Sequence, residues 1–232
     1  MADQTQRRAL LRERRVAPSI LSADFARLGA QVRDVLDAGA RVIHVDVMDG
    51  HFVPPITFGA IVVGALSDLV HDAGGALDVH LMVERPERHV ADIARAGADN
   101  ITVHVEATPH VHYALDQIRD GGCCAGAAIC PATPVGALSE VAPDMLDVAL
   151  CMSVNPGWGA QSFIPASLRK LARLRAALPD GVALEVDGGI HEQTAAGVVE
   201  AGANLLVTGS AVFGSDDPAA AYTRIAAAAG IA

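Results

Sequence analysis

The stretch DAGARVIHVD, residues 37–46, joins the end of a predicted helix to an apolar run of strand type. The segments RAGADNITVH (95–104) and EAGANLLVTG (200–209) repeat this junction, each with Ala-Gly-Ala before the apolar run. Glycine at that place supplies the left-handed conformation that ends a helix, and alanine lets the helix end pack closely on a sheet. The repeated junction predicts a series of βα units around a parallel sheet.

Short apolar runs alternate with longer stretches of helical period along the whole chain. We expect eight strands, at residues 15–20, 41–46, 77–81, 100–105, 124–129, 145–152, 183–186 and 204–207. We expect eight helices, at residues 25–38, 60–72, 86–96, 111–121, 134–141, 165–177, 192–201 and 218–229. Eight such pairs favour an α/β fold made of a single closed (β/α)8 TIM barrel over an open doubly wound sheet. No GxGxxG motif follows the first strand, which argues against a dinucleotide-binding fold.

The predicted barrel forms one catalytic domain, residues 15–232, and residues 1–14 are expected to be an N-terminal extension. The extension is basic and could form a short helix, but it lacks the apolar centre of a secretory signal.

Composition narrows the function classes. The chain has 232 residues, of which 51% are hydrophobic and only 3% aromatic, so Val, Leu, Ile and Ala must build the core. Its net charge of −10 argues against a nucleic-acid partner, and no apolar stretch approaches the roughly 20 residues of a membrane span. The four cysteines show no CxxC spacing, which is typical of reduced thiols in a cytoplasmic protein.

Four side chains that can bind a divalent cation stand at the ends of predicted strands. His44 and Asp46 lie two apart on one strand, so they point to the same face, while His80 lies on another and Asp187 directly follows a third. Burying such groups is costly without a metal or a reaction, and barrel active sites lie at the carboxyl ends of strands. The sequence therefore predicts metal-assisted acid–base chemistry around one divalent ion, for which zinc, iron, manganese and cobalt are all compatible.

Three glycine-rich loops follow the last three predicted strands. They read NPGWGAQ (155–161), DGG (187–189) and GS (209–210). Backbone amides in such loops bind phosphate, and barrel enzymes commonly use the loops after strands 7 and 8 for this purpose. The loops contain no Lys or Arg, so phosphate binding would depend on amides and dipoles.

Six motifs, in chain order, resemble those of the ribulose-phosphate 3-epimerase family. They are APSILSADF (17–25), HVDVMDGHFVP (44–54), DVHLMV (78–83), SVNPGWGAQSFI (153–164), EVDGGI (185–190) and GSAVFG (209–214). The resemblance implies a (β/α)8 metalloenzyme that interconverts D-ribulose 5-phosphate and D-xylulose 5-phosphate, a phosphorylated ketose pair, by epimerisation at carbon 3. It also suggests a homo-oligomer, either a dimer or a hexamer.

The resemblance further assigns residue roles. The metal ligands would be His44, Asp46, His80 and Asp187. Asp46 and Asp187 would act as the two acid–base groups on opposite faces of the sugar, through an enediolate. The substrate would be contacted by Ser19, His80, Gly157, Trp158, Gly159, Ala160, Asp187, Gly188, Gly189, Gly209 and Ser210. An apolar cap over the reacting carbons would be formed by Met48, Met82 and Met152.

Four positions depart from the family pattern, among them Trp158, where many members have a second aromatic type. Many members have Gly where Ala160 stands; alanine keeps its backbone N–H, so phosphate binding survives unless a positive φ is required there. Pro55 and Cys130 also replace other residue types, which could change loop detail and substrate preference.

Other readings of the sequence remain open. A 3-epimerase of a six-carbon ketose phosphate, such as allulose 6-phosphate, is the nearest. A Schiff-base aldolase or lysine-dependent decarboxylase needs a lysine at a strand end, whereas the only lysine, Lys170, falls in the predicted helix after the sixth strand. A non-catalytic barrel would have lost a ligand or an aspartate, and all are present. His104 and Glu106 alternate on the fourth strand and could support the ligands.

Overall fold

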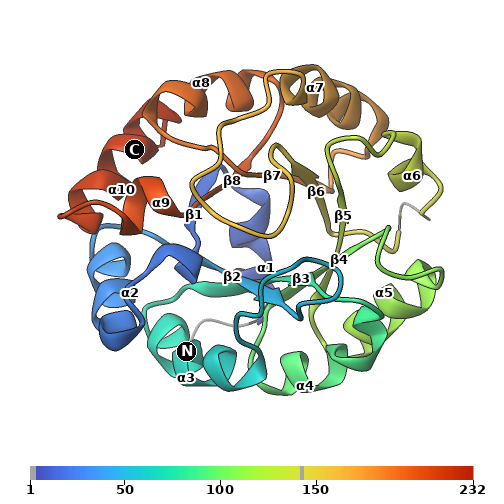
Figure 1. Ribbon diagram of the computed structural model, residues 1–232, viewed down its shortest axis with the longest axis horizontal. Coiled ribbons are helices and arrows are strands. Elements are labelled where there is room, and N and C mark those ends of the chain that lie inside the picture. The colour runs from blue at the N-terminus through green and yellow to red at the C-terminus, as the bar shows by residue number, and fades with distance from the viewer. Residues whose placement is uncertain (1–3, 142–143, 232) are drawn as a thin grey trace.

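Eight parallel strands form one barrel in the computed structural model, which describes residues 4–141 and 144–231. The strands are β1 (Arg15–Pro18), β2 (Val42–Met48), β3 (Ala76–Met82), β4 (Asn100–His104), β5 (Cys124–Ile129), β6 (Val148–Met152), β7 (Ala183–Asp187) and β8 (Leu205–Thr208). Their order around the sheet is β1-β8-β7-β6-β5-β4-β3-β2, and a parallel bridge between Ser19 and His44 brings β1 against β2. The predicted single (β/α)8 barrel is therefore confirmed (Figure 1).

An outer ring of helices covers the strands (Figure 1). These helices are α2 (Leu28–Asp37), α3 (Ala60–Asp72), α4 (Val90–Arg95), α5 (Val111–Asp120), α6 (Gly136–Ser139), α7 (Ser167–Ala177), α8 (Glu192–Glu200) and α10 (Pro218–Ala228). Shorter elements add α9 (Ser210–Phe213) and the 3-10 turns η1 (Ile20–Ser22), η2 (Phe25–Arg27) and η3 (Pro86–Arg88).

The predicted helix–strand junctions adopt the expected geometry. Gly39, Gly97 and Gly202 have φ angles of 107°, 107° and 104°, so each ends its helix in a conformation that favours glycine. The next residues then enter β2, β4 and β8.

The predicted element boundaries differ from the structure in a few places. The first strand was expected to reach residue 20, but it ends at Pro18 because the Ser19 hydroxyl accepts a hydrogen bond from Leu21 N and starts η1. The helix expected at 86–96 begins as η3 after Arg85, whose φ is 56°, and continues as α4. The helix expected at 134–141 is shortened to α6.

The N-terminal segment forms a further helix, α1 (Gln4–Arg12), at the amino end of the barrel. Figure 1 shows it behind the ring of strands. Its Leu11 is 1% exposed and packs in a cluster with Ala17, Val42, Cys124, Val148, Ala183, Leu205 and Val207. The Asn204 side chain donates to the carbonyl oxygen of Leu11 at 2.9 Å, which fixes the end of the helix. The amino end of the barrel is thus filled by aliphatic side chains.

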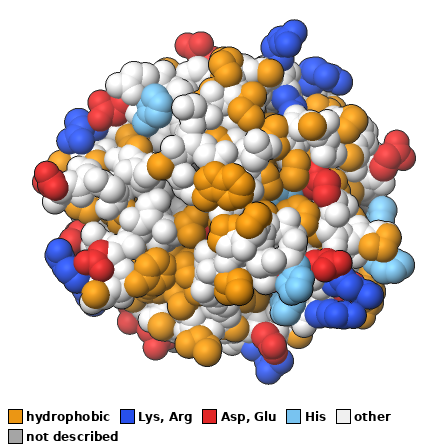
Figure 2. All heavy atoms as spheres, viewed as in Figure 1, with side chains coloured by type: hydrophobic (Ala, Val, Ile, Leu, Met, Phe, Trp, Pro, Cys, Tyr) orange, Lys and Arg blue, Asp and Glu red, His pale blue; other side chains and the backbone are white. Residues whose placement is uncertain are grey.

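At the carboxyl end, strand register brings chemically active residues into neighbouring positions. Asp46 on β2 pairs with His80 on β3, and Asp187 on β7 pairs with Met152 on β6. Charged side chains lie mostly around the margin of the view in Figure 2, and apolar and uncharged groups fill much of its middle. Among the described residues, no helix is long and apolar enough to cross a membrane.

Candidate active site

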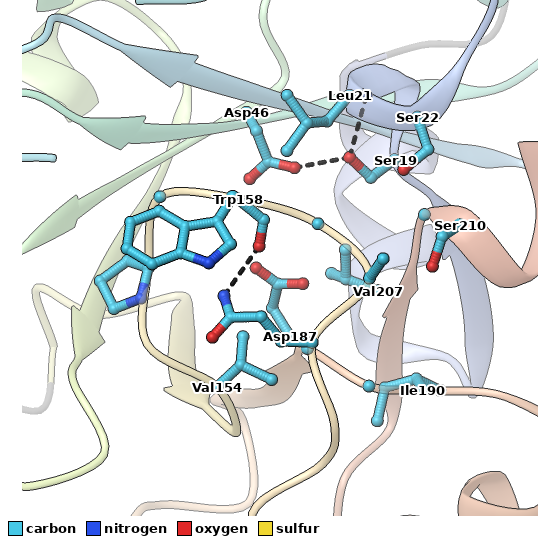
Figure 3. A pocket seen from close by; sticks show the side chains of 18 of the residues that line it. Ser19, Leu21, Ser22, Asp46, Val154, Trp158, Asp187, Ile190, Val207 and Ser210 are labelled. Atoms are coloured by element: carbon cyan, nitrogen blue, oxygen red, sulfur yellow. Dashed lines mark hydrogen bonds between the residues drawn. The ribbon is translucent and has the colours of Figure 1, made fainter. Parts of the chain in front are cut away.

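A cavity of about 340 Å³ opens at the carboxyl ends of the strands (Figure 3). Such a volume is in the range of small-molecule sites. The residues predicted to contact substrate that line it are Ser19, Gly157, Trp158, Gly159, Ala160, Asp187, Gly188, Gly189, Gly209 and Ser210. Asp46 and the three methionines Met48, Met82 and Met152 line it as well. His44 and His80 do not, because both are fully buried beneath the cavity floor.

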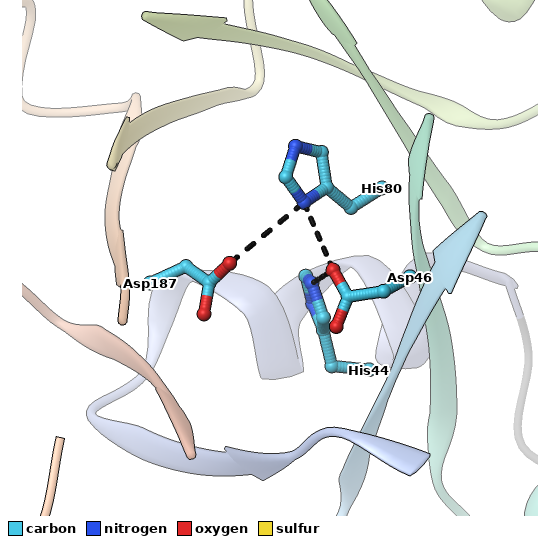
Figure 4. A group of neighbouring side chains, drawn as sticks. All are labelled: His44, Asp46, His80 and Asp187. Carbon is cyan, nitrogen blue, oxygen red and sulfur yellow. Dashed lines mark hydrogen bonds and ion pairs between the residues drawn. The ribbon is translucent and has the colours of Figure 1, made fainter. Parts of the chain in front are cut away.

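The four predicted ligands form one cluster (Figure 4). One donor atom from each of His44, Asp46, His80 and Asp187 lies within 4.8 Å of the others. The Oδ1 atom of Asp46 lies 3.1 Å from His80 Nδ1 and 3.3 Å from His44 Nε2. The Oδ2 atom of Asp187 lies 3.9 Å from the same His80 nitrogen. Strands β2, β3 and β7 thus aim their side chains at one point.

The His44 ring is oriented for ligation by a carboxylate behind it. Its Nδ1 lies 2.7 Å from Asp78 Oδ2, and Asn100 donates to the other Asp78 oxygen at 2.6 Å. The buried Nε2 of His44 makes no hydrogen bond within the described part of the chain. A nitrogen that is buried, oriented and without a hydrogen bond fits a cation ligand, since a second partner normally fixes the tautomer of a metal-binding histidine. The donor set of two imidazoles and two carboxylates therefore fits a divalent metal.

Two acidic residues at the floor of the site were missed in the sequence. Asp78 precedes His80 by two residues and Glu185 precedes Asp187 by two, so each shares the inward face of its strand with a predicted ligand. Glu185 Oε1 lies 3.4 Å from His44 Nδ1. Burial and the neighbouring Asp78 raise the pKa of Glu185 well above its ordinary value. The two-residue spacing was the signal that could have identified both.

The two candidate acid–base residues differ in proton affinity. Burial and the nearby Asp46 carboxylate raise the pKa of Asp187 to about 7. Burial acts in the same upward direction on Asp46, but the charges of His44 and His80 and the hydrogen bond with His80 outweigh it and hold the pKa of Asp46 well below its ordinary value. Ser19 also donates to Asp46 Oδ2 at 2.5 Å. These environments push the two carboxyl groups apart in proton affinity, as paired acid–base groups require.

The three methionines form apolar walls above the ligands. Met48 and Met82 pair in the register of β2 and β3 and pack with Val53, whereas Met152 packs with Val154 on the far side. Each methionine is at most 3% exposed. They line the same cavity as Asp46 and Asp187, and their flexible side chains can adapt to a bound molecule; the cap over the reacting carbons stays a prediction.

The glycine-rich loops need their glycines for close backbone approach. A Cβ at Gly188 would lie 2.3 Å from a Val154 side-chain atom, and one at Gly189 would lie 2.5 Å from the Phe163 backbone nitrogen. The Ser153 hydroxyl donates to the carbonyl oxygens of Asp187 and Gly188 at 2.8 and 2.7 Å, which holds the turn after β7 in place.

Ala160 has a φ of 59°, which places a non-glycine residue in the left-handed region. Alanine therefore adopts the positive φ of this loop itself, at a cost in strain, and keeps its backbone N–H. The Gln161 amide donates to the carbonyl oxygens of Asn155 and Trp158 at 2.7 and 2.8 Å, and these bonds hold the loop in its strained shape.

Lys170 lies on α7, outside the residues that line the cavity. Its Nζ donates to the carbonyl oxygens of Cys130 and Pro131 at 2.6 and 3.2 Å. The structure thus gives this lysine an anchoring role, and lysine-dependent aldolase or decarboxylase chemistry loses its required residue.

The fold and the site define a class of protein: a single-barrel enzyme whose cavity combines two aspartates and glycine-rich loops, with two histidines buried beside the aspartates. The model of the ribulose-phosphate 3 epimerase family matches residues 15–213. The chain is 47% identical over 215 residues to ribulose-phosphate 3-epimerase from Bacillus subtilis, covering 91% of this chain and 97% of that protein. It is 52% identical over 215 residues to ribulose-phosphate 3-epimerase from Synechocystis sp., covering 90% and 92%. The chain therefore belongs to the ribulose-phosphate 3-epimerase family and is an epimerase, an enzyme of the isomerase class.

Solved structures of lower identity support the fold alone. KGPDC from Streptococcus mutans is similar with a TM-score of 0.71 at 15% identity, covering 93% of this chain and 97% of that one.

Proposed function

We propose that the protein epimerises carbon 3 of D-ribulose 5-phosphate to give D-xylulose 5-phosphate, a reaction of pentose phosphate metabolism. The observation that carries the proposal is the placement of Asp46 and Asp187 on β2 and β7, in one cluster at the cavity. The proposal is also supported by membership of the epimerase family, which extends over nearly the whole chain.

The two aspartates suit a two-base epimerisation. Inversion at carbon 3 removes a proton from one face of the sugar and returns one to the opposite face, through an enediolate. A single base would tend to return the proton to the face from which it came. Asp46 and Asp187 come from well-separated strands, so they can reach a sugar held between them from two sides. The hydrogen bond from Ser19 orients the Asp46 carboxylate.

One divalent ion (zinc, iron, manganese or cobalt) would be held by His44, Asp46, His80 and Asp187. When bound, such an ion would act as a Lewis acid toward the sugar. The chain itself supplies the orientation of the ligands, through Asp78 on His44, and an apolar cap of methionines that excludes water from the reacting carbons.

The phosphate end would lie against the glycine-rich loops after β6, β7 and β8. Gly157, Gly189 and Gly209 all line the same cavity as the aspartates, and among the residues that the structure describes no Lys or Arg does. Backbone amides of these loops can hold an anion without a basic side chain. This arrangement fits a chain whose net charge of −10 would repel phosphate at long range.

Turnover of defined substrates tests the proposal. Protein purified without chelator should convert ribulose 5-phosphate and contain about one divalent ion per chain by elemental analysis. Faster turnover of allulose 6-phosphate would transfer the assignment to six-carbon ketose phosphates, and failure with both would contradict the proposal.

We also propose that the enzyme is a cytoplasmic homo-oligomer. Light scattering of the purified protein gives its mass in solution, and a mass of one chain would contradict that proposal.

A further inference from the structure

We propose that Glu106, acting through His104, is a positioning residue that holds His80 in the tautomer required for metal binding. The inference rests on the proposed metal site. It concerns residues that lie behind the cavity and touch neither the substrate space nor the other ligands.

A continuous line of polar contacts leads from the ligand cluster to the surface. His80 Nε2 lies 2.9 Å from His104 Nε2, and His104 Nδ1 lies 3.1 Å from Glu106 Oε2. Both rings are fully buried, whereas the side chain of Glu106 is 25% exposed. The ring of Phe52 covers His104, with 4.8 Å between ring centroids. The line therefore runs from Glu106, a carboxylate near solvent, to Asp46, a carboxylate in the ligand cluster.

The glutamate is fixed as an acceptor by its other contacts. Its Oε1 accepts hydrogen bonds from the backbone nitrogen of Cys130, at 2.8 Å, and from the Thr133 hydroxyl. An ionised carboxylate has no hydrogen to donate. The contact with His104 Nδ1 must therefore receive its hydrogen from the histidine.

The number of N–H groups available along this line of contacts decides which tautomer of His80 is favoured. Three contacts lie in series: Asp46 to His80, His80 to His104, and His104 to Glu106. Two neutral imidazole rings carry only two N–H groups, and neither carboxylate supplies one. A cation on His80 Nδ1 removes the need for a hydrogen at the first contact. Then His80 Nε2–H donates to His104 Nε2, and His104 Nδ1–H donates to Glu106, so every contact is satisfied.

The same count excludes a second cation beside the first. His104, Glu106 and Cys130 also offer donor atoms within 4.8 Å of one another. A cation on His104 Nδ1 would move the hydrogen of that neutral ring to Nε2. His80 would then carry its own hydrogen on Nδ1 and could not bind a metal there. The two positions are mutually exclusive with neutral rings, and the network favours the one on His80.

Replacing Glu106 by glutamine tests the mechanism because it keeps the size of the side chain. Its one carbonyl oxygen is required by the Cys130 backbone N–H, so the NH₂ group faces His104 Nδ1 and reverses the tautomers along the line. We expect Glu106→Gln to weaken zinc binding about 10- to 100-fold, the usual effect of losing an outer partner of a metal ligand. Zinc affinity is measured by competition with a chromogenic chelator. Glu192→Gln, in an exposed pair with Arg224, is the matched control and should bind zinc as the wild type does.

A double-mutant cycle separates tautomer control from simple anchoring of the loop after β5. In His104→Gln the amide oxygen can accept from His80 Nε2–H without help from Glu106. Glu106→Gln should then have little further effect on zinc affinity in this background. An equal loss in both backgrounds would show that Glu106 only anchors the loop and would overturn the inference.

Nitrogen NMR of zinc-loaded, ¹⁵N-histidine-labelled wild-type protein reports the tautomer directly and requires no variant to fold. We expect the hydrogen of His104 on Nδ1; its presence on Nε2 would overturn the inference. His71, whose Nε2 lies 2.8 Å from Asp99, is an internal reference. If the wild type binds no zinc, cobalt, manganese or iron at all, the proposed metal site itself fails, which is a separate result.

Discussion

The two ends of the barrel bury side chains to the same extent but of opposite character. At the amino end, Leu11 packs against small and aliphatic residues, and a hydrogen bond from Asn204 holds the helix end. At the carboxyl end, His44, His80 and Asp78 are equally buried although they are polar. Burying unpaired polar or charged groups costs free energy, whereas burying aliphatic groups stabilises the fold. The amino end therefore stabilises the barrel, and the carboxyl end uses part of that stability to keep reactive groups in place.

The largest expected effect is at the carboxyl end. Asp187→Asn removes one of the two proposed acid–base groups, and loss of such a group typically lowers kcat by about 10²- to 10⁴-fold. The melting temperature of the metal-free protein should stay the same or rise, because an amide is easier to bury than a carboxylate. The kcat is measured on the metal-loaded protein and the melting temperature on the metal-free protein, because Asp187 is also a proposed metal ligand.

Asp147→Asn, at the amino end beside Arg12, is the control and should keep nearly full activity. Near-normal turnover of Asp187→Asn would contradict the two-base account.

The next effect is at the amino end and has the opposite signature. Leu11→Ala should lower the free energy of unfolding by about 2–5 kcal/mol, because it leaves a cavity in a tightly packed cluster. The kcat should be unchanged under conditions where the variant is folded. Urea unfolding measures the loss.

Leu10→Ala, whose side chain is only partly buried, provides the comparison and should lose less stability. A large fall in kcat for Leu11→Ala would show that the two ends are coupled.

The pH dependence of stability should also differ between variants at the two ends. The Glu106 carboxylate has its pKa lowered to about 2, because hydrogen bonds from His104 and Thr133 outweigh the opposing effect of burial. A lowered folded-state pKa contributes stability above the ordinary value of 4.5, and this contribution is lost as the pH falls from there toward 2. The stability difference between wild type and Glu106→Gln should therefore shrink over this window.

Leu11→Ala loses only apolar contacts, so its stability curve should run parallel to that of the wild type. Urea unfolding at pH 5, 4 and 3.5 would test this, and a constant difference between wild type and Glu106→Gln would contradict it.

The smallest effect concerns the strained loop after β6. Ala160→Gly relieves a left-handed alanine, which costs about 1–2 kcal/mol. Glycine also gives the unfolded chain more conformational freedom, which lowers stability by about 0.4–1 kcal/mol. We expect a net gain of stability of up to about 1.6 kcal/mol by urea unfolding. A loss of stability would show that the loop carries no strain at Ala160.

The sequence predicted the fold and the ligand cluster for the same physical reason. His44, His80 and Asp187 are polar residues at the ends of apolar runs, and parallel strands in a barrel bring their carboxyl ends together. The repeated Ala-Gly-Ala junction identified the helix ends, so even the chain direction of each unit was predictable.

Other features could not be predicted because they depend on three-dimensional placement. Leu11 fills the amino end because α1 lies under the barrel, and no local sequence pattern indicates that position. The contact between His80 and His104 depends on how β3 and β4 are tilted, since the register partner of His80 is Thr102. The positive φ of Ala160 could not be predicted, because alanine rarely adopts such an angle. The division of the chain at residue 14 stays a prediction.

The central claim is that two aspartates exchange the carbon-3 proton of ribulose 5-phosphate on opposite faces. Its most direct test is NMR of the product formed in D₂O by metal-loaded wild-type protein. The account predicts that newly formed xylulose 5-phosphate carries deuterium at carbon 3 and that Asp187→Asn forms almost none of it. Product that keeps its original proton would contradict the account, because the same proton would then have been carried from one face to the other.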